Sequence, residues 1–271
     1  MKFRIKPVHF LEAFMIILAF LFLYPILFVF MSALKPDAEI MLNPLSPPTK
    51  FYIDNFVKAW TVMKFPKTVL TTFLITVGGV AGILLTSSMA AWKLARTGTR
   101  YSVVIYTLFA FALVIPFQII MVPLSVLASD MNLTNPPGLV LLYWGLGAPM
   151  AIFMYHGFVK GVPRELEESA AIDGAGTGYI FFKIVLPLLQ PITATIAILD
   201  ALWIWNDYLL PLLIIKQGTL QLAQMAFNGQ FLKEYGPLTA SLVLSSLPIM
   251  VFYLFSQKYI IKGIAAGAVK G

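Results

Sequence analysis

Long apolar runs without charge dominate this sequence and set what it can fold into. Five of them contain no Asp, Glu, Lys or Arg: Ala13–Leu34, Thr68–Trp92, Tyr101–Ser129, Met131–Val159 and Tyr235–Gln257. A helix of about 20 residues crosses the roughly 30 Å hydrocarbon core of a bilayer, so each run is long enough to span it. A sixth run, about Pro191–Ile215, qualifies if Asp200 and Asp207 face protein or water rather than lipid.

The composition also indicates a membrane protein. Hydrophobic residues make up 59% of the chain and charged residues 11%, whereas a soluble domain carries about 25% charged residues. We therefore expect an all-α polytopic membrane protein with one transmembrane domain over residues 1–271. The first apolar run is too long for a cleaved signal peptide, and no small-residue cleavage site follows it. The expected spans cover about 11–34, 68–92, 101–127, 137–159, 191–215 and 236–259, with a loop at 160–190 and a tail at 260–271.

Several kinds of chemistry are excluded by residue type. The chain has no cysteine, which excludes disulfides and thiolate sites. Its two histidines, His9 and His156, lie too far apart in sequence for a typical histidine-rich metal site. The G-x-x-x-x-G-K-[ST] phosphate loop is absent. We therefore expect no metal site and no enzymatic activity in this chain alone.

The positive charges predict the orientation. With the N-terminus inside, twelve of the 19 lysines and arginines fall in inner loops, and all arginines are among them. This bias favours cytoplasmic termini, although the rule works best for short loops and the first outer loop is long. The net charge of +7 is spread over these loops rather than gathered in a patch, so we expect no nucleic-acid partner. The loop at 160–190 is then cytoplasmic.

This cytoplasmic loop predicts a helix, a turn and a second short helix. Pro163 suits a first helical position, and the acids that follow it favour the positive end of the helix dipole. Gly174 can take a positive φ and end the helix, and the second helix can run to Pro187. The first helix is either a docking surface for another protein or an ordinary amphipathic helix at the membrane interface. Its acids are Glu165, Glu167 and Glu168.

The spacing in this loop resembles the EAA loop of ABC-importer permeases. Glu168-Ser169-Ala170 is followed after three residues by Gly174, and after nine more by Ile184, one residue and Leu186-Pro187. Ser169 replaces the family's usual alanine, a small-for-small change. Asp173-Gly174-Ala175 and Trp205-Asn206-Asp207-Tyr208 are similar to the carbohydrate-uptake branch. The chain is identified as a member of the MalG-type permease subunits, with six transmembrane helices in the type I importer fold.

The resemblance implies an ATP-driven importer of sugars or oligosaccharides in a bacterial or archaeal cytoplasmic (inner) membrane. A second, MalF-like permease would complete the translocation path, and an extracellular or periplasmic sugar-binding protein would deliver the sugar. A dimeric cytoplasmic ATPase would hold ATP and magnesium, and this chain would need no cofactor of its own. By resemblance Glu168 pairs with a basic ATPase residue. The ATPase-coupling residues implied are Glu168, Ser169, Ala170, Asp173, Gly174, Ala175, Leu186 and Pro187.

Polar residues in the fifth expected span have two interpretations. Asp200, Trp203 and Asp207 lie at i, i+3 and i+7 on one helix face. With Asn206 they are candidates for the translocation path, and Trp203, Trp205 and Tyr208 offer flat surfaces for sugar rings. Alternatively, Asn206 and Asp207 bond neighbouring helices and the tryptophans form an interfacial belt. An alternative function, a secondary transporter or channel using Asp200 and Asp207, also stays open.

Two outer loops complete the predictions. The loop Lys216–Tyr235 is polar, and we expect it to be mobile. By resemblance its residues Asn228, Gly229 and Gln230 are candidate contacts with the binding protein; the alternative is a plain connector. The loop Lys35–Lys67 is expected to form an ordered extracellular cap.

Overall fold

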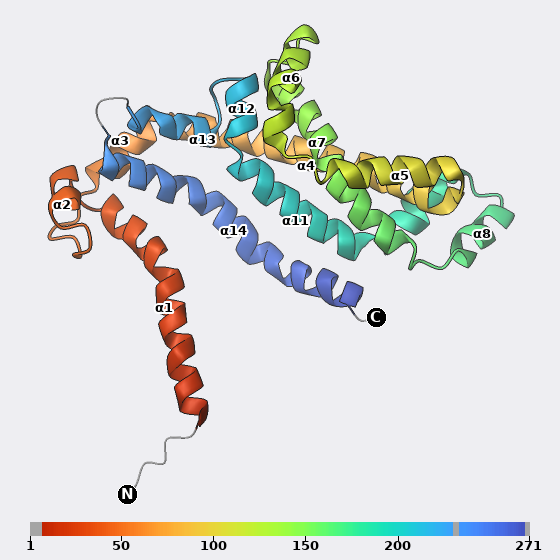
Figure 1. Cartoon of the computed structure of the whole chain (residues 1–271), viewed down its shortest axis with the longest axis horizontal. Helices are drawn as coiled ribbons and strands as arrows, with labels where there is room; N and C mark the ends of the chain where they lie inside the picture. The colour runs from red at the N-terminus through yellow and green to blue at the C-terminus, as the bar shows by residue number, and fades with distance from the viewer. Residues whose placement is uncertain (1–6, 230–232, 269–271) are drawn as a thin grey trace, which may run out of the picture. The chain divides into compact units, whose positions relative to one another are not determined.

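The computed structural model describes residues 7–229 and 233–268, and most of this part is helical (Figure 1). The predicted all-α fold is confirmed. An isolated antiparallel bridge joins Asn228 to Lys233. The helices are α1 (Pro7–Ala33), α2 (Asp37–Leu42), α3 (Asp54–Val62), α4 (Phe65–Thr97), α5 (Arg100–Ala112), α6 (Phe117–Asp130), α7 (Pro136–Val159), α8 (Glu165–Ile172), α9 (Thr177–Tyr179), a π-helix (Ile180–Val185), α10 (Leu186–Leu188), α11 (Gln190–Asn206), α12 (Leu209–Ile214), α13 (Leu220–Ala223), a 3-10 helix (Gln224–Phe227) and α14 (Tyr235–Ala268).

Four of these helices are each long and apolar enough to cross a membrane alone, over Phe10–Ala33, Phe65–Thr97, Pro136–Val159 and Tyr235–Gln257. Two further candidates are bent pairs of helices. Arg100–Ala112 and Phe117–Asp130 meet at 105°, and Thr177–Leu188 and Gln190–Asn206 meet at 77°. The described residues therefore offer six spans if each bent pair counts as one.

The bend between α5 and α6 departs from the straight span that hydropathy predicts at 101–127. The second bend lies before the span predicted at 191–215, but that span is itself interrupted at Asn206. In the first pair Pro116 stands at the N-cap of α6, where its backbone is extended (φ −62, ψ 134) and its missing N–H cannot continue a helix. In the second region α11 ends at Asn206, because Asp207 adopts an extended backbone with ψ 129. The last part of the predicted span is the separate helix α12.

The chain forms two compact units, which we describe separately: Met1–Thr68 with Ala223–Pro248, and Val69–Leu222 with Ile249–Gly271. In the first unit the loop that follows α1 is ordered around Lys35, whose side chain is fully buried. The Lys35 ammonium donates to the carbonyl oxygens of Asn43 (3.1 Å) and Pro44 (3.4 Å) and to the Ser46 hydroxyl (3.4 Å). The Asn55 amide donates to the Lys35 carbonyl at 2.7 Å.

The loop Lys216–Tyr235, which its polarity predicts to be mobile, has regular structure in its described part. It contains α13 and the 3-10 helix. Three of its apolar side chains are buried and hold this part in place: Leu220, Leu222 and Phe227.

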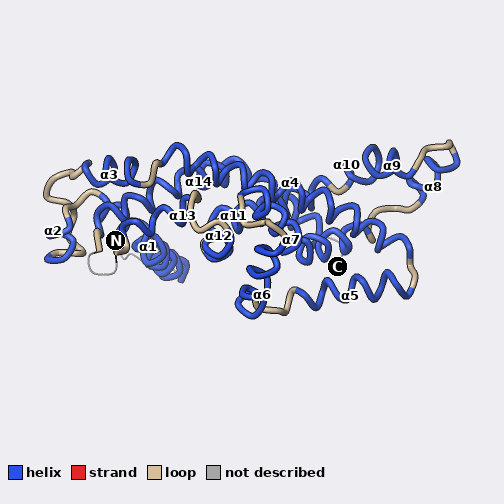
Figure 2. The backbone as a smooth tube through the Cα atoms, turned by 90° about the horizontal axis from the view of Figure 1, so that it is seen from above, coloured by secondary structure: helices blue, strands red, loops and turns tan. Residues whose placement is uncertain are grey.

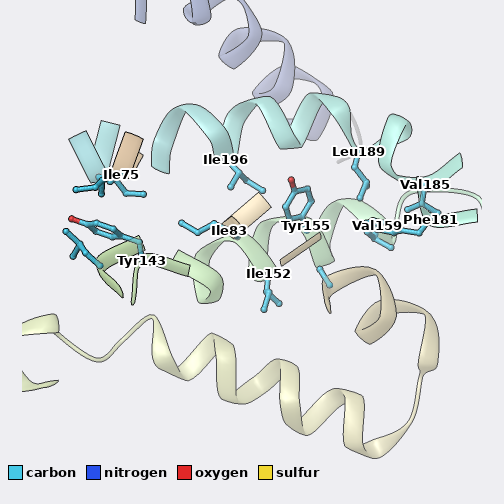
Figure 3. Close-up of a cluster of buried hydrophobic side chains, with 14 of the residues drawn as sticks. Ile75, Ile83, Tyr143, Ile152, Tyr155, Val159, Phe181, Val185, Leu189 and Ile196 are labelled. Atoms are coloured by element: carbon cyan, nitrogen blue, oxygen red, sulfur yellow. The ribbon is translucent and has the colours of Figure 1, made fainter. Parts of the chain in front are cut away.

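The core of the second unit lies among α4, α7, α11 and the π-helix, and Figure 3 shows part of it. Glycines let α4 and α7 approach closely, as is common for small residues between membrane helices. A Cβ atom at Gly82 would overlap the Trp144 indole. That indole donates from Nε1 to the Gly78 carbonyl at 2.9 Å. Figures 1 and 2 place α8 at one end of this unit, beyond α5 and α7.

Candidate functional site

The helix α8 begins two residues after Pro163 and ends in a Schellman motif. The Gly174 N–H donates to the Ala171 carbonyl at 3.1 Å, and the Ala175 N–H donates to the Ala170 carbonyl at 2.9 Å. This pattern requires a left-handed residue after the C-cap, and Gly174 has φ +84. No atom lies within 4 Å of where a Cβ would stand. Glycine is therefore needed here for the backbone conformation, as the sequence predicts, rather than for space.

The acids at the start of α8 point in different directions. The Glu167 carboxylate faces the protein, where Oε1 accepts from Arg96 Nε (2.8 Å) and Nη2 (2.7 Å) and Oε2 accepts from Trp92 Nε1 (2.9 Å). The two charged side chains are only 14% and 13% exposed. Glu168 is exposed and forms no ion pair with any described residue. Glu167 therefore anchors α8 to the end of α4, and Glu168 is free to meet a partner.

The anchoring role of Glu167 is not visible as a motif in the sequence. The two residues that donate to Glu167 do give a weak signal in the sequence. Trp92 and Arg96 are four residues apart, so they share one face of a helix and can converge on a single acceptor. The sequence gives no means of choosing that acceptor among the acids of the loop.

The other predicted coupling residues divide between an exposed face and a packed face. Ser169 is exposed, and its hydroxyl donates to the Glu165 carbonyl within α8 at 2.7 Å. Asp173 is also exposed, and its neighbour Ile172 is 85% exposed. By contrast Ala170, Ala175 and Leu186 pack against the core. The face of α8 that points away from the core therefore combines carboxylates with a large apolar side chain.

The segment after α8 turns into the fifth span through a π-helix, a helix type that is often found at functional sites. The ring of Phe181, in this π-helix, lies 5.3 Å from the ring of Trp92. Pro187 is exposed and lies in α10, which therefore includes this proline instead of ending before it. Beside this segment is a cavity of about 520 Å³, lined by Ala81, Leu84, Leu85, Tyr155, Phe182, Leu186, Pro187, Gln190 and Thr193.

Two of the four candidate path residues line a second cavity of about 520 Å³. The Trp203 ring meets the Tyr143 ring edge to face, with centroids 5.4 Å apart. Asp207 accepts from the Tyr143 hydroxyl at 2.9 Å and from the Leu209 N–H at 3.0 Å. The lining residues are Ala112, Leu113, Ile115, Phe117, Gln118, Ile120, Gly145, Leu146, Pro149, Trp203, Asp207, Leu209 and Leu210.

Asp200 and Asn206 are not among the residues lining this cavity. Asp200 is 6% exposed, and its Oδ2 accepts no hydrogen bond from the described residues. The Asn206 amide donates to the Leu202 carbonyl of its own helix at 2.8 Å. Asp207 lies beyond the end of α11, so it does not continue the helix face of Asp200 and Trp203 on which the i, i+3, i+7 spacing places it. Trp205 is only 4% exposed and is enclosed in its unit.

The candidate contacts with a binding protein fall at the end of the 3-10 helix in the first unit. Asn228 and Gly229 are exposed, and the Asn228 N–H donates to the Met225 carbonyl at 3.0 Å. Gln230 lies outside the described residues. Asn228 also pairs with Lys233 in an isolated antiparallel bridge.

Comparison with known proteins identifies the family. Residues 78–266 match the model of the binding-protein-dependent transport system inner membrane component. The probable starch degradation products transport system permease protein AmyC of Thermoanaerobacterium thermosulfurigenes is 38% identical, over 94% of each chain. The multiple sugar-binding transport system permease protein MsmG of Streptococcus mutans is 36% identical, over 92% of each chain.

A solved structure supports the fold. A chain from the crystal structure of a bacterial ABC transporter involved in the import of the acidic polysaccharide alginate superposes with a TM-score of 0.81. The two chains are 21% identical, and the match covers 96% of this chain and 99% of the other. The family decides against the alternative of a secondary transporter or channel. The chain belongs to the binding-protein-dependent transport system inner membrane components: it is a multi-pass permease subunit of an ABC transporter, not an enzyme, and a partner subunit hydrolyses the ATP.

Proposed function

We propose that this chain is the permease subunit of an ATP-driven importer of sugars or oligosaccharides, and that α8 docks onto the partner ATPase. The single observation that supports the docking role is that two neighbouring acids of α8 have different surroundings. Glu167 fixes the helix to its own unit, while Glu168 and Ile172 are exposed. An exposed acid beside an exposed apolar side chain suits a basic, partly apolar cleft on a partner. The sugar substrate is supported by the names of the relatives AmyC and MsmG.

The complete importer contains further subunits. A second, MalF-like permease completes the translocation path, a dimeric cytoplasmic ATPase holds ATP and magnesium, and an extracellular or periplasmic protein delivers the sugar. The cavity lined by Trp203 and Asp207 is the candidate part of the path in this chain, because an aromatic ring beside a hydrogen-bonding group suits a sugar. Asn228 and Gly229 are the candidate contacts for the binding protein.

Both termini lie in the cytoplasm, and residues 1–271 form one permease domain in this proposal. The ion pair between Arg96 and Glu167 supports this orientation, because it joins the end of α4 to the loop after α7. The two loops must then lie on the same side of the membrane. That side also carries Arg100 and Arg164, as expected for a cytoplasmic face.

Reconstitution of the four kinds of subunit in proteoliposomes tests the proposal. The expected result is ATP-dependent uptake from a panel of radiolabelled oligosaccharides supplied with the binding protein. Glu168→Ala should reduce uptake at least tenfold while membrane insertion stays normal. Glu165→Ala is the matched control, since Glu165 is an exposed acid on the same helix. Normal uptake by Glu168→Ala, or failure of any ATPase to co-purify with the native chain, would contradict the docking role.

A further inference from the structure

We propose that Trp92, Arg96 and Glu167 form a clamp that transmits movement of α8 directly into α4. In this view the coupling loop drives the span at α4 as well as the spans to which it is joined through the chain. The inference rests on the proposed docking of α8 onto an ATPase. It assigns Trp92, Arg96 and Glu167 as positioning residues for transport, a role distinct from that of Glu168.

The clamp fixes both the distance and the direction between the two helices. Arg96 donates from two nitrogens to one carboxylate oxygen of Glu167, and Trp92 donates to the other. Arg96 Nη2 also donates to the Val162 carbonyl at 2.9 Å, so one guanidinium holds both α8 and the chain just before it. Several charge-assisted bonds in fixed geometry constrain orientation in a way that a single flexible ion pair does not. The low exposure of the two charges shields the pair from water and salt.

The chain segments that precede and follow α8 transmit its movement less firmly than the clamp does. On its C-terminal side Gly174, Gly176 and Gly178 follow within a few residues, and none of them has an atom within 4 Å of an added Cβ. On its N-terminal side residues 160–164 form turns and bends rather than helix. Displacement of α8 can be absorbed in such segments by small backbone rotations. A lateral contact that does not depend on them is therefore required for firm transmission.

The contact ends on a helix that can carry a displacement. Among the described residues, every side-chain hydrogen bond from α8 to another helix comes from Glu167 and ends on α4. α4 continues without a break for 33 residues, and at Gly82 it packs tightly against α7. The Trp92 ring also contacts Phe181 of the π-helix. The clamp thus links α8, α4 and the segment that leads into the fifth span.

The test uses the complete reconstituted importer and measures sugar taken up per ATP hydrolysed, together with the amount of ATPase that co-purifies. Glu167→Gln and Arg96→Gln should each lower uptake per ATP at least tenfold, while ATPase co-purification stays within twofold of the native complex. The double variant should be no worse than either single variant, because both remove the same contact. Glu165→Gln, on the same helix but outside the clamp, should leave both measurements unchanged.

Three results would overturn the clamp. Uptake per ATP could be unchanged in Glu167→Gln, the losses of Glu167→Gln and Arg96→Gln could multiply in the double variant, or ATPase co-purification could fall in step with uptake. The last result would show that Glu167 only keeps α8 folded for docking. If the native complex itself shows no ATP-driven uptake, the proposed function fails and the clamp fails with it. If the native complex takes up sugar but the variants give one of these three results, the clamp alone is refuted and the proposed function stands.

Discussion

Replacing Gly82 by alanine tests the close packing of α4 against α7. The added Cβ would overlap Cε2 and Nε1 of the Trp144 indole. Because these are atoms of a rigid ring rather than the end of a flexible chain, the whole ring must move. The move would break the 2.9 Å hydrogen bond from Trp144 Nε1 to the Gly78 carbonyl. One methyl group therefore disturbs both shape and hydrogen bonding at this contact.

The magnitude follows from three contributions. Forcing an extra methyl group into a packed interior costs about 1–3 kcal/mol. Loss of a hydrogen bond between membrane helices costs about 0.6–1.7 kcal/mol. Alanine offsets up to about 1 kcal/mol of this through its higher helix propensity. The net expectation for Gly82→Ala is a loss of about 1–4 kcal/mol in the free energy of unfolding.

The assay is a denaturant titration of the purified full chain in detergent, followed by tryptophan fluorescence. Gly145→Ala is the matched control, because Gly145 also lies in a membrane helix and an added Cβ there has no atom within 4 Å. We expect Gly145→Ala to be neutral or slightly stabilising. If the two variants unfold within about 0.5 kcal/mol of each other, a margin comparable to ordinary surface substitutions, the tight α4–α7 contact is refuted.

Three further substitutions test other parts of the molecule. Gly174→Ala should lower the free energy of unfolding by about 1–2 kcal/mol, because Gly174 has φ +84, and it should also lower ATPase co-purification. Gly176→Ala is the control and should change neither quantity, because Gly176 has φ −70. Tyr143→Phe removes the hydrogen bond to the Asp207 carboxylate, which lies between α11 and α12. The loss should lower the free energy of unfolding by about 1.5–3 kcal/mol and should slow initial uptake. Lys35→Met removes the three hydrogen bonds that the buried ammonium donates; it should cost about 1–3 kcal/mol and should increase proteolysis of its loop. Lys58→Met, which breaks a half-exposed ion pair, should change stability by about 0–1 kcal/mol.

The spans could be predicted from the sequence because hydropathy depends on local composition alone. The bends could not be predicted, since the length of an apolar run does not state its direction. A proline such as Pro116 is compatible with a kinked helix or with a full break, and the packing of neighbouring helices decides between them. At Asp207 no breaker residue marks the end of α11. There the carboxylate accepts from the Leu209 N–H, which favours the extended turn over a continued helix.

The loop at 160–190 also combines a feature that the sequence predicts with a contact that it does not. Gly174 was predictable, since a glycine after an amphipathic helix indicates a left-handed C-terminal residue. The anchoring contact of Glu167 was not, because Glu167 and Glu168 are both acids near the start of one helix and have the same local preference. What distinguishes Glu167 is its contact with Trp92 and with Arg96, which lies 71 residues earlier in the chain. A local sequence pattern cannot predict a role that depends on a partner so distant in the chain.

The two carboxylates of the fifth span also acquire different roles from their surroundings. A cation-coupled carrier would need Asp200 and Asp207 to act on one pathway. In the structure Asp207 lines a cavity and is held by Tyr143, whereas Asp200 is buried outside that cavity's lining with one oxygen unbonded by the described residues. The arrangement places Asp207 in the wall of this cavity and gives no shared site to the pair. In the function that we propose, movement of α8 on ATP binding and hydrolysis therefore acts mechanically on the membrane helices, first through its contacts with α4 and through the contact of Trp92 with the π-helix.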